Sequence, residues 1–88
     1  MNNINARFLY MMINVRDKEL LKTLGLRLRT MRKSADLSQE KLANEADISI
    51  SQVSRIERGL LNPTLCTLAS LANALDVELK DLVDIGKE

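Results

Sequence analysis

Apolar residues recur at intervals of three and four along the segment that begins at Asp17. The positions that follow this spacing are Leu20, Leu21, Leu24, Leu28 and Met31. Such spacing places them on one face of an amphipathic helix, with Lys and Arg residues on the opposite face. Asp17 and Glu19 suit the positive end of the helix dipole, and Arg32 and Lys33 suit its negative end. The pattern predicts a helix from Asp17 to about Ala35.

A second, shorter helix is predicted to begin after Ser38. Serine is a good N-cap, because its hydroxyl accepts a hydrogen bond from an otherwise unpaired backbone N–H. The apolar face of this segment is narrow and consists of Leu42, Ala43 and Ala46. We therefore expect a short helix that packs closely against its neighbours.

A third helix is predicted in the segment DISISQVSRIERG, residues 47–59. Ser49 and Gln52 have the spacing of a capping box, in which each side chain bonds the backbone N–H of the other. Val53 and Ile56 point inward, and Gly59 follows the helix where a left-handed residue is favoured. Apart from Ile48 and Ile50, the remaining positions of this helix are polar or charged, so one face of it is free for contact with something other than the core.

Two more helices complete the pattern. Thr64 is the predicted cap of a fourth helix. Its buried side is predicted to comprise Leu65, Leu68, Leu71, Ala72 and Leu75. Asp76 ends it, and ELKDLVDI gives a short last helix. The fold class is thus all-α with five helices, and the tight connection between the second and third is typical of a helix-turn-helix.

Residues 1–15 show no helical periodicity, although RFLYMMINV is a short apolar run that suits a strand, an arm or the lead-in to a helix. Met11 or Met12 is an alternative start of the chain. We interpret residues 1–16 as an N-terminal extension or arm and residues 17–88 as one domain.

The composition excludes several classes of function. The 88 residues include no histidine and one cysteine, which removes Cys/His zinc sites and the Ser-His-Asp and Cys-His catalytic arrangements. We expect no enzyme activity, no cofactor and no metal. One cysteine forms no internal disulfide and suits a reducing cytoplasm. No apolar run approaches the length of a membrane span.

The charge is unevenly distributed although the net charge is only +1. Residues 16–41 carry eight Lys and Arg against four Asp and Glu, whereas residues 61–88 carry two against five. A basic half indicates a face turned towards a polyanion. The alternative is an ordinary solvated charge pattern.

Three motifs in this order, LSQEKLA, VSRIERG and NPTLCTLASLANALDV, resemble the phage-repressor (Cro-like, XRE-type) helix-turn-helix family. The likeness covers about residues 24–83. It implies a compact lambda-repressor-like domain and a sequence-specific transcriptional regulator that binds double-stranded DNA as a homodimer on a palindromic operator. Restriction–modification controllers, antitoxins and phage or mobile-element repressors all fit. The alternative is a protein-interaction module that keeps the fold without binding DNA.

The resemblance implies that the third helix reads bases in the major groove. The matching positions are Ser49, Ile50, Ser51 and Arg55. Arg55 can contact guanine with two hydrogen bonds, and Ser51 can donate or accept one. Ile50 departs from the polar residue often found there, and suits either a thymine methyl group or a face with another use. The alternative for all four is a solvated helix face.

The resemblance also implies contacts to the DNA backbone and one internal ion pair. Its phosphate-binding positions correspond to Gln39, Arg58, Asn62 and Thr64. Arg27 and Arg29 are expected either to reach the DNA backbone or to be solvated. Arg32 and Glu57 match a partly buried ion pair that fixes geometry more than it adds stability.

Three aspartates stand where the family usually has glycine at a helix end, at positions 36, 47 and 76. Aspartate tolerates left-handed backbone better than most residues do, although less well than glycine. Cys66 falls near the start of the fourth helix, where we expect an inert, partly buried thiol rather than a redox sensor.

Two surfaces are candidates for the dimer contact. The acidic C-terminal region offers Val77, Leu79, Leu82, Val83 and Ile85. These are more apolar groups than so short a helix is expected to bury, and this surface is the favoured prediction. The other candidate is the apolar run RFLYMMINV, which as a strand could pair with the same strand of a second copy.

Overall fold

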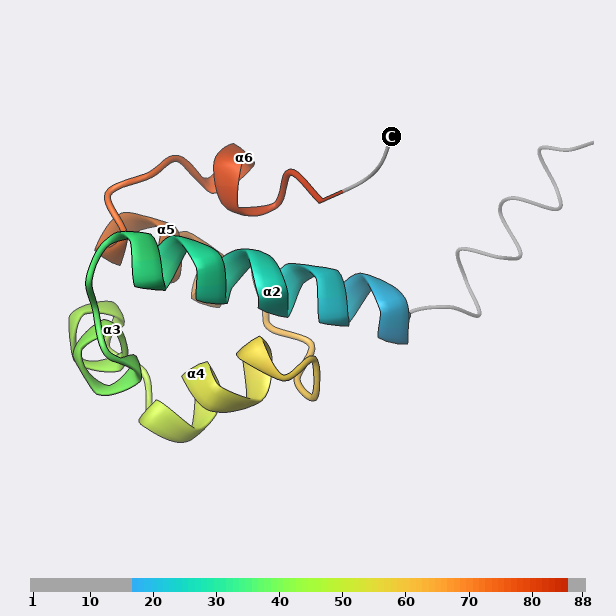
Figure 1. The fold of residues 1–88 in the computed structure, drawn as a ribbon, viewed down its shortest axis with the longest axis horizontal. Coiled ribbons are helices and arrows are strands. Elements are labelled where there is room, and N and C mark those ends of the chain that lie inside the picture. The colour runs from blue at the N-terminus through green and yellow to red at the C-terminus, as the bar shows by residue number, and fades with distance from the viewer. Residues whose placement is uncertain (1–16, 86–88) are drawn as a thin grey trace, which may run out of the picture.

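The computed structural model describes residues 17–85, and within that range the chain forms five α-helices and no strand (Figure 1). The helices are α2 (Lys18–Ser34), α3 (Gln39–Ala46), α4 (Ile50–Glu57), α5 (Leu65–Ala74) and α6 (Leu79–Leu82). The predicted all-α architecture is confirmed. The connection between α3 and α4 spans residues 47–49, as expected of a helix-turn-helix.

The longest helix, α2, organises the molecule. In Figure 1 it runs across the centre, with α3 and α4 below it and α6 above it. It packs against α4 and α6, while α3 packs against α4 and α5, and α5 packs against α6. The helix-turn-helix pair is therefore held between α2 and α5, and α4 is left with one face towards solvent.

Every described helix contributes to a single aliphatic core. The largest fully buried side chains are Leu28, Leu42, Val53, Ile56, Leu71 and Leu82. Burial of an aliphatic side chain of this size stabilises a fold by about 1.5–3 kcal/mol. Because the core has no aromatic residue within the described range, its stability depends on many such contacts of similar size.

The predicted N-caps are confirmed by hydrogen bonds. Ser38 Oγ accepts from Lys41 N at 3.0 Å, and Thr64 Oγ1 accepts from Thr67 N at 3.1 Å. The capping box on α4 is present, because Ser49 Oγ accepts from the Gln52 N–H at 3.1 Å and Gln52 Oε1 accepts from the Ser49 N–H at 3.2 Å. These short-range bonds fix where α3, α4 and α5 begin.

Four helices end on a residue with left-handed backbone. The φ angles are 62° at Asp36, 58° at Asp47, 74° at Gly59 and 59° at Asp76. Each turn is closed by a backbone bond to the carbonyl five residues earlier, from Leu37, Ile48, Leu60 and Val77 respectively. This is the Schellman arrangement. The left-handed positions expected for the three aspartates are confirmed.

We expect Asp76→Gly to raise the stability of the protein. Glycine adopts positive φ without the steric cost that a Cβ imposes, so the gain is about 0.5–1 kcal/mol, or roughly 2–8 °C in Tm for a domain of this size. Thermal unfolding followed by circular dichroism measures it. Asp84→Gly is the control, because Asp84 does not have positive φ; equal gains at both positions would contradict the argument.

Two side chains predicted to be buried are exposed instead. Leu65 is 68% exposed and Leu20 is 46% exposed. Each lies in the first turn of its helix, and the fully buried residues of α2 and α5 lie further along. Periodicity places these leucines on the correct face, but the neighbouring helices cover only the later turns. Cys66, expected to be partly buried, is also exposed.

The predicted extension, residues 1–16, lies outside the described residues, as does the apolar run RFLYMMINV within it. Among residues 17–85, no helix has the length and apolar character needed to cross a membrane.

Candidate nucleic-acid interface

The helix α4 is fixed to the core by two side chains. Val53 and Ile56 are 0% and 1% exposed, and both belong to the main apolar cluster. The capping box at Ser49 holds the start of the helix, and the left-handed Gly59 follows its end. A recognition helix requires this kind of support, because its outer side chains must present a fixed pattern to base edges.

The four predicted base-reading residues share one exposed surface. Ser49, Ile50, Ser51 and Arg55 are all exposed, and they lie at the N-cap and along the outer face of α4. Ile50 is 49% exposed, so an apolar group stands among polar ones. Arg55 forms no ion pair within residues 17–85, which leaves its guanidinium available. Ser49 is partly committed, because its hydroxyl caps the helix.

Three of the four predicted phosphate-binding residues are also exposed. Arg58, Asn62 and Thr64 follow α4 and precede α5. The Thr64 hydroxyl caps α5 and donates to Thr67 Oγ1 at 3.0 Å. These residues therefore lie at the N-terminus of α5, and helix N-termini favour anions.

Gln39 is the exception among the phosphate-binding predictions. It is the first residue of α3 and is half-buried. Its Nε2 donates to Glu57 Oε1 at 3.0 Å, so the amide is oriented by a carboxylate at the end of α4. This bond links the two helices of the helix-turn-helix. The sequence resemblance assigns Gln39 to phosphate and gives no indication of this bond.

The predicted Arg32–Glu57 ion pair is present. Arg32 Nε donates to Glu57 Oε2 at 2.6 Å and Nη2 donates to Oε1 at 3.1 Å, while the two side chains are 10% and 3% exposed. Arg32 Nη1 also donates to the Leu37 carbonyl at 2.8 Å. The hydrogen bond to Glu57 raises the pKa of Arg32 above its usual value, against the lowering effect of burial. The pair joins α2, the connection to α3, and α4.

Two further residues position the interface without facing it. Gly25 on α2 meets the end of α4 so closely that a Cβ there would lie 2.5 Å from both the Ile56 and the Glu57 carbonyl oxygens. Arg27 donates from Nε and Nη2 to the Asp81 carbonyl at 2.9 and 2.7 Å, and thereby fastens α6 to α2. The isolated glycine in a helical pattern is a signal of close packing that sequence reasoning missed.

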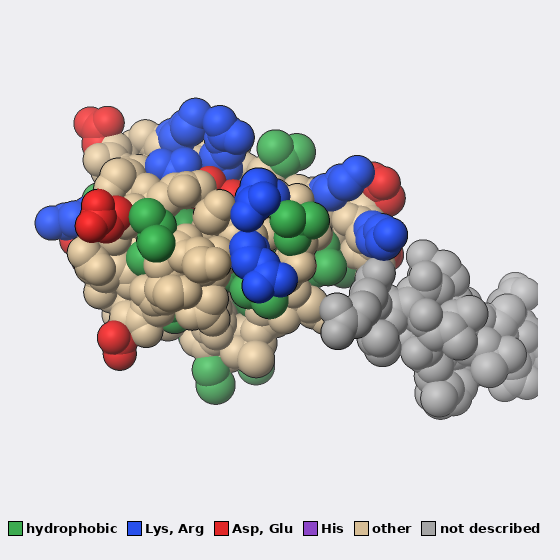
Figure 2. Space-filling model, turned by 90° about the horizontal axis from the view of Figure 1, so that it is seen from below, with side chains coloured by type: hydrophobic (Ala, Val, Ile, Leu, Met, Phe, Trp, Pro, Cys, Tyr) green, Lys and Arg blue, Asp and Glu red, His purple; other side chains and the backbone are tan. Residues whose placement is uncertain are grey.

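Basic side chains gather on the side of the molecule that carries α4. In Figure 2, which looks from below Figure 1, Lys and Arg side chains lie at the upper edge, in the middle and at both ends of this face. Most Asp and Glu side chains in view lie towards its edges. Such a distribution attracts an extended polyanion despite the small net charge. Within the described residues, no cluster of His, Cys, Asp and Glu has the composition of a metal site.

Comparisons with known proteins agree with this geometry. A family described as helix-turn-helix matches residues 28–82. The control protein C.BamHI of Bacillus amyloliquefaciens is 43% identical over 61 residues, which cover 68% of this chain and 75% of that protein. The immunity repressor of Bacillus phage phi105 is 39% identical over 61 residues, covering 69% of this chain. The matching region spans only 42% of the phage repressor.

Solved structures give the same result. The restriction–modification controller C.AhdI of Aeromonas hydrophila has a TM-score of 0.70 and 42% identity, over 70% of this chain and 94% of its own. The clp gene regulator ClgR of C. glutamicum has a TM-score of 0.71 and 29% identity, over 74% and 83% of the two chains. The chain therefore belongs to the Cro-like (XRE-type) helix-turn-helix family of transcriptional regulators, which are DNA-binding proteins and not enzymes.

Proposed function

We propose that this protein is a sequence-specific regulator that binds a palindromic operator as a homodimer, with α4 in the major groove of double-stranded DNA. One observation carries the proposal. The outer face of α4 presents exposed Ser51 and Arg55, while the inner face of the same helix is locked into the core by Val53 and Ile56. Helices that read bases have this two-sided construction. Such a regulator would act in the cytoplasm.

The subclass is that of a small controller or repressor. The relatives include a restriction–modification control protein and a phage immunity repressor, and the match to the control protein covers the larger share of the relative. We infer that this chain regulates genes in a comparable setting, which includes restriction–modification loci, toxin–antitoxin loci and mobile elements.

Selection of bound sequences from a random pool of duplex DNA is the direct test of the proposal. We expect an enriched palindrome whose half-site centres lie about 34 Å apart, one helical turn, because the two recognition helices must enter the same side of the duplex. Enrichment of a single, asymmetric half-site would contradict the homodimer. Absence of any enriched sequence would contradict sequence-specific binding.

A protein-interaction module is the second candidate, and two exposed residues favour it. Ile50 places an apolar group on the reading face, and Asp47 places a negative charge beside it. The salt dependence of DNA binding separates the candidates. A DNA-binding regulator releases counterions and loses affinity steeply as salt rises, whereas a protein-interaction module has no such slope with duplex DNA.

We expect Arg55→Ala to weaken binding to the selected operator by about 1–3 kcal/mol per half-site and to relax the preference at one base pair. The reason is that a bidentate contact to guanine discriminates between bases. Fluorescence anisotropy with the operator and with single-base variants measures both effects. Arg58→Ala is the matched control and should weaken all sequences alike. A uniform loss in Arg55→Ala would show that Arg55 contacts phosphate instead.

The predicted dimer surface needs one correction. Leu82 is 0% exposed and belongs to the core of its own chain, so it offers no surface to a partner. It is buried because α6 folds back against α2 and α5, a contact that the short C-terminal pattern did not reveal. Of the other predicted residues, Val77, Leu79 and Ile85 are half-buried and Val83 is 39% exposed.

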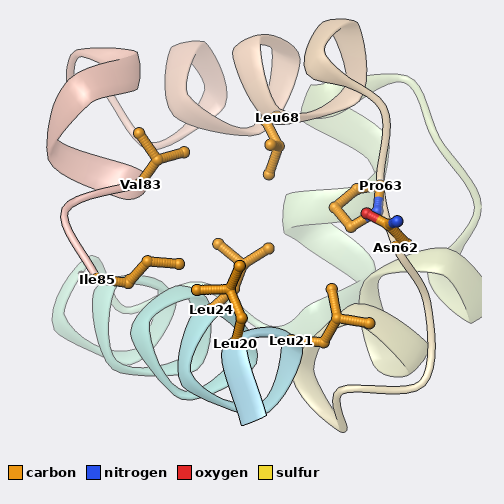
Figure 3. Close-up of a pocket in the computed structure, with 8 residues that line it drawn as sticks. All are labelled: Leu20, Leu21, Leu24, Asn62, Pro63, Leu68, Val83 and Ile85. Atoms are coloured by element: carbon orange, nitrogen blue, oxygen red, sulfur yellow. The ribbon is translucent and has the colours of Figure 1, made fainter. Parts of the chain in front are cut away.

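Val83 borders an apolar groove that extends this surface. The groove has a volume of about 410 Å³ and lies between the first turns of α2, the start of α5 and the segment after α6. Figure 3 shows Leu20, Leu24, Leu68, Val83 and Ile85 directed towards it. We propose that a second copy of the chain covers this groove, because the groove is continuous with Val83 and operator recognition requires two copies.

We expect Leu20→Glu and Val83→Glu to dissociate the dimer. A charge buried without a partner costs about 3 kcal/mol, and a symmetric dimer contains two such sites, so the total of about 6 kcal/mol raises the dimer Kd on the order of 10,000-fold. Light scattering over a concentration series measures the change. Leu26→Glu is the control on the same helix, since Leu26 is 62% exposed and lies outside the groove. If a chain that starts at Met12 becomes monomeric while both groove variants stay dimeric, the N-terminal arm forms the interface.

A further inference from the structure

A second, more polar pocket of about 280 Å³ lies between the first turn of α2 and the chain that follows α4. Its lining consists of Lys18, Leu21, Lys22, Arg58, Gly59 and Leu60. Two of these residues are lysines that neither the motifs nor the family resemblance connects with DNA. The pocket shares only Leu21 with the apolar groove.

Backbone contacts fix the walls of this pocket. At Gly59, whose φ is 74°, an added Cβ would lie 3.0 Å from both Cα and Cγ of Lys22. The start of α2 therefore rests directly against the end of α4. On the other wall, the Leu60 N–H donates to the Arg55 carbonyl at 2.8 Å and the Gly59 N–H donates to the Ile56 carbonyl at 3.0 Å. The three cationic residues thus line a pocket whose walls are tied to the recognition helix.

The charges in the pocket are not neutralised within the described part of the chain. Lys18, Lys22 and Arg58 form no ion pair there, whereas Lys41 and Lys80 each pair with a glutamate. Arg58 Nε donates a long hydrogen bond of 3.4 Å to the Ser54 carbonyl. The two acidic residues at this end of α2 do not line the pocket, and Asp17 is engaged as the N-cap.

The chemistry of the pocket suits a phosphodiester. Three cationic residues line the same pocket, while Leu21 and the 57% exposed Leu60 offer apolar contact to the carbon atoms of a sugar. Arg58 belongs both to this pocket and to the predicted phosphate-binding set. A duplex that engages α4 and Arg58 therefore brings its own backbone to Lys18 and Lys22, whereas an acidic peptide would need an independent path.

We propose that Lys18 and Lys22 form, with Arg58, an additional binding site for the DNA backbone, outside the helix-turn-helix and beside the base pairs that α4 reads. The inference rests on the proposed function. It assigns the first turn of α2 to the DNA interface. It also gives Gly59 a second role: besides adopting left-handed backbone after α4, Gly59 lacks a side chain and so lets the first turn of α2 approach α4.

Salt titrations of operator binding test the assignment. Each phosphate contact contributes about 0.9 to the slope of log affinity against log salt, so Lys18→Ala and Lys22→Ala should each lower the slope by about 1.8 in a dimer. The double variant should lower it by about 3.6, so that between 50 and 200 mM salt it loses roughly 150-fold less affinity than the wild type. Lys80→Ala, which removes an exposed lysine on α6, should leave the slope within error of the wild type.

A second measurement identifies the contact itself. Replacing single backbone phosphates of the operator with uncharged methylphosphonates should reveal positions that weaken the wild type but have no effect on the double variant. Equal slopes for the double variant and Lys80→Ala would overturn the assignment while leaving operator recognition intact. Failure of the proposed function gives a different result, because the wild type itself would then show no sequence preference. That result would also rule out the proposed site at Lys18 and Lys22.

Discussion

Replacing Arg32 with alanine is expected to lower the free energy of unfolding by about 3–5 kcal/mol, because it leaves the buried carboxylate of Glu57 without its cation. Stability for a chain of this size is roughly 4–13 kcal/mol in total, so the loss is a large fraction of it. The corresponding fall in Tm is roughly 12–40 °C. Only the Gln39 amide would still donate to Glu57 within the described residues. Urea and thermal unfolding measure the effect.

Two control variants distinguish the effect of breaking a buried ion pair from the effect of removing a positive charge. Lys41→Ala removes the cation of an exposed pair with Glu45, 3.8 Å apart, and should change stability by less than about 1 kcal/mol. The double variant Arg32→Met with Glu57→Leu removes both charges together and should regain most of the lost stability. A single Arg32→Ala variant as stable as Lys41→Ala would show that the pair is solvated.

The double variant also tests what the ion pair does for the interface. Without Glu57, the Gln39 amide loses the acceptor that orients it at the start of α3. If Gln39 contacts phosphate, a stable double variant should bind all DNA sequences more weakly while keeping its preference among them. The buried pair would then contribute geometry to recognition rather than net stability.

The helix boundaries could be predicted from the sequence because they depend on neighbouring residues. A serine or threonine caps a helix by a bond that spans three positions, as at Ser38, Ser49 and Thr64. Left-handed backbone at Asp47 and Asp76 is likewise a local property. The same holds for the outer face of α4, since its exposed positions follow from the inward direction of Val53 and Ile56 in that helix.

Burial could not be predicted as well, because it depends on what lies opposite. Leu65 and Leu82 both carry the apolar character of a core residue, yet one is 68% exposed and the other is 0% exposed. Leu82 is buried because α6 packs against α2 and α5, whereas Leu65 lies in the first turn of α5, which the neighbouring helices do not cover. Arg27, interpreted as solvated or DNA-facing, instead donates to the Asp81 carbonyl across 54 positions of sequence.

Gly25→Ala is expected to destabilise the protein by about 3 kcal/mol, within the range for overpacked cores and at its upper end. The added methyl would lie 2.5 Å from two backbone carbonyl oxygens at the end of α4, a separation that no rotamer change relieves. In an exposed helix interior the same substitution stabilises by about 1 kcal/mol, since alanine is the better helix former. The sign of the change is therefore diagnostic of the close contact between α2 and α4.

The same substitution should affect DNA binding beyond its effect on folding. To accept the methyl group, α2 and α4 must separate, and the carbonyls that move belong to Ile56 and Glu57, one an anchor of α4 and the other the partner of Arg32. We expect weaker operator binding by the folded fraction, measured by anisotropy at a temperature well below the Tm of the variant. Thr30→Ala, at an exposed position of the same helix, is the control and should leave binding unchanged. A Gly25→Ala protein that is more stable than the wild type would contradict this close contact. It would show that a Cβ at position 25 lies further than 2.5 Å from the Ile56 and Glu57 carbonyl oxygens.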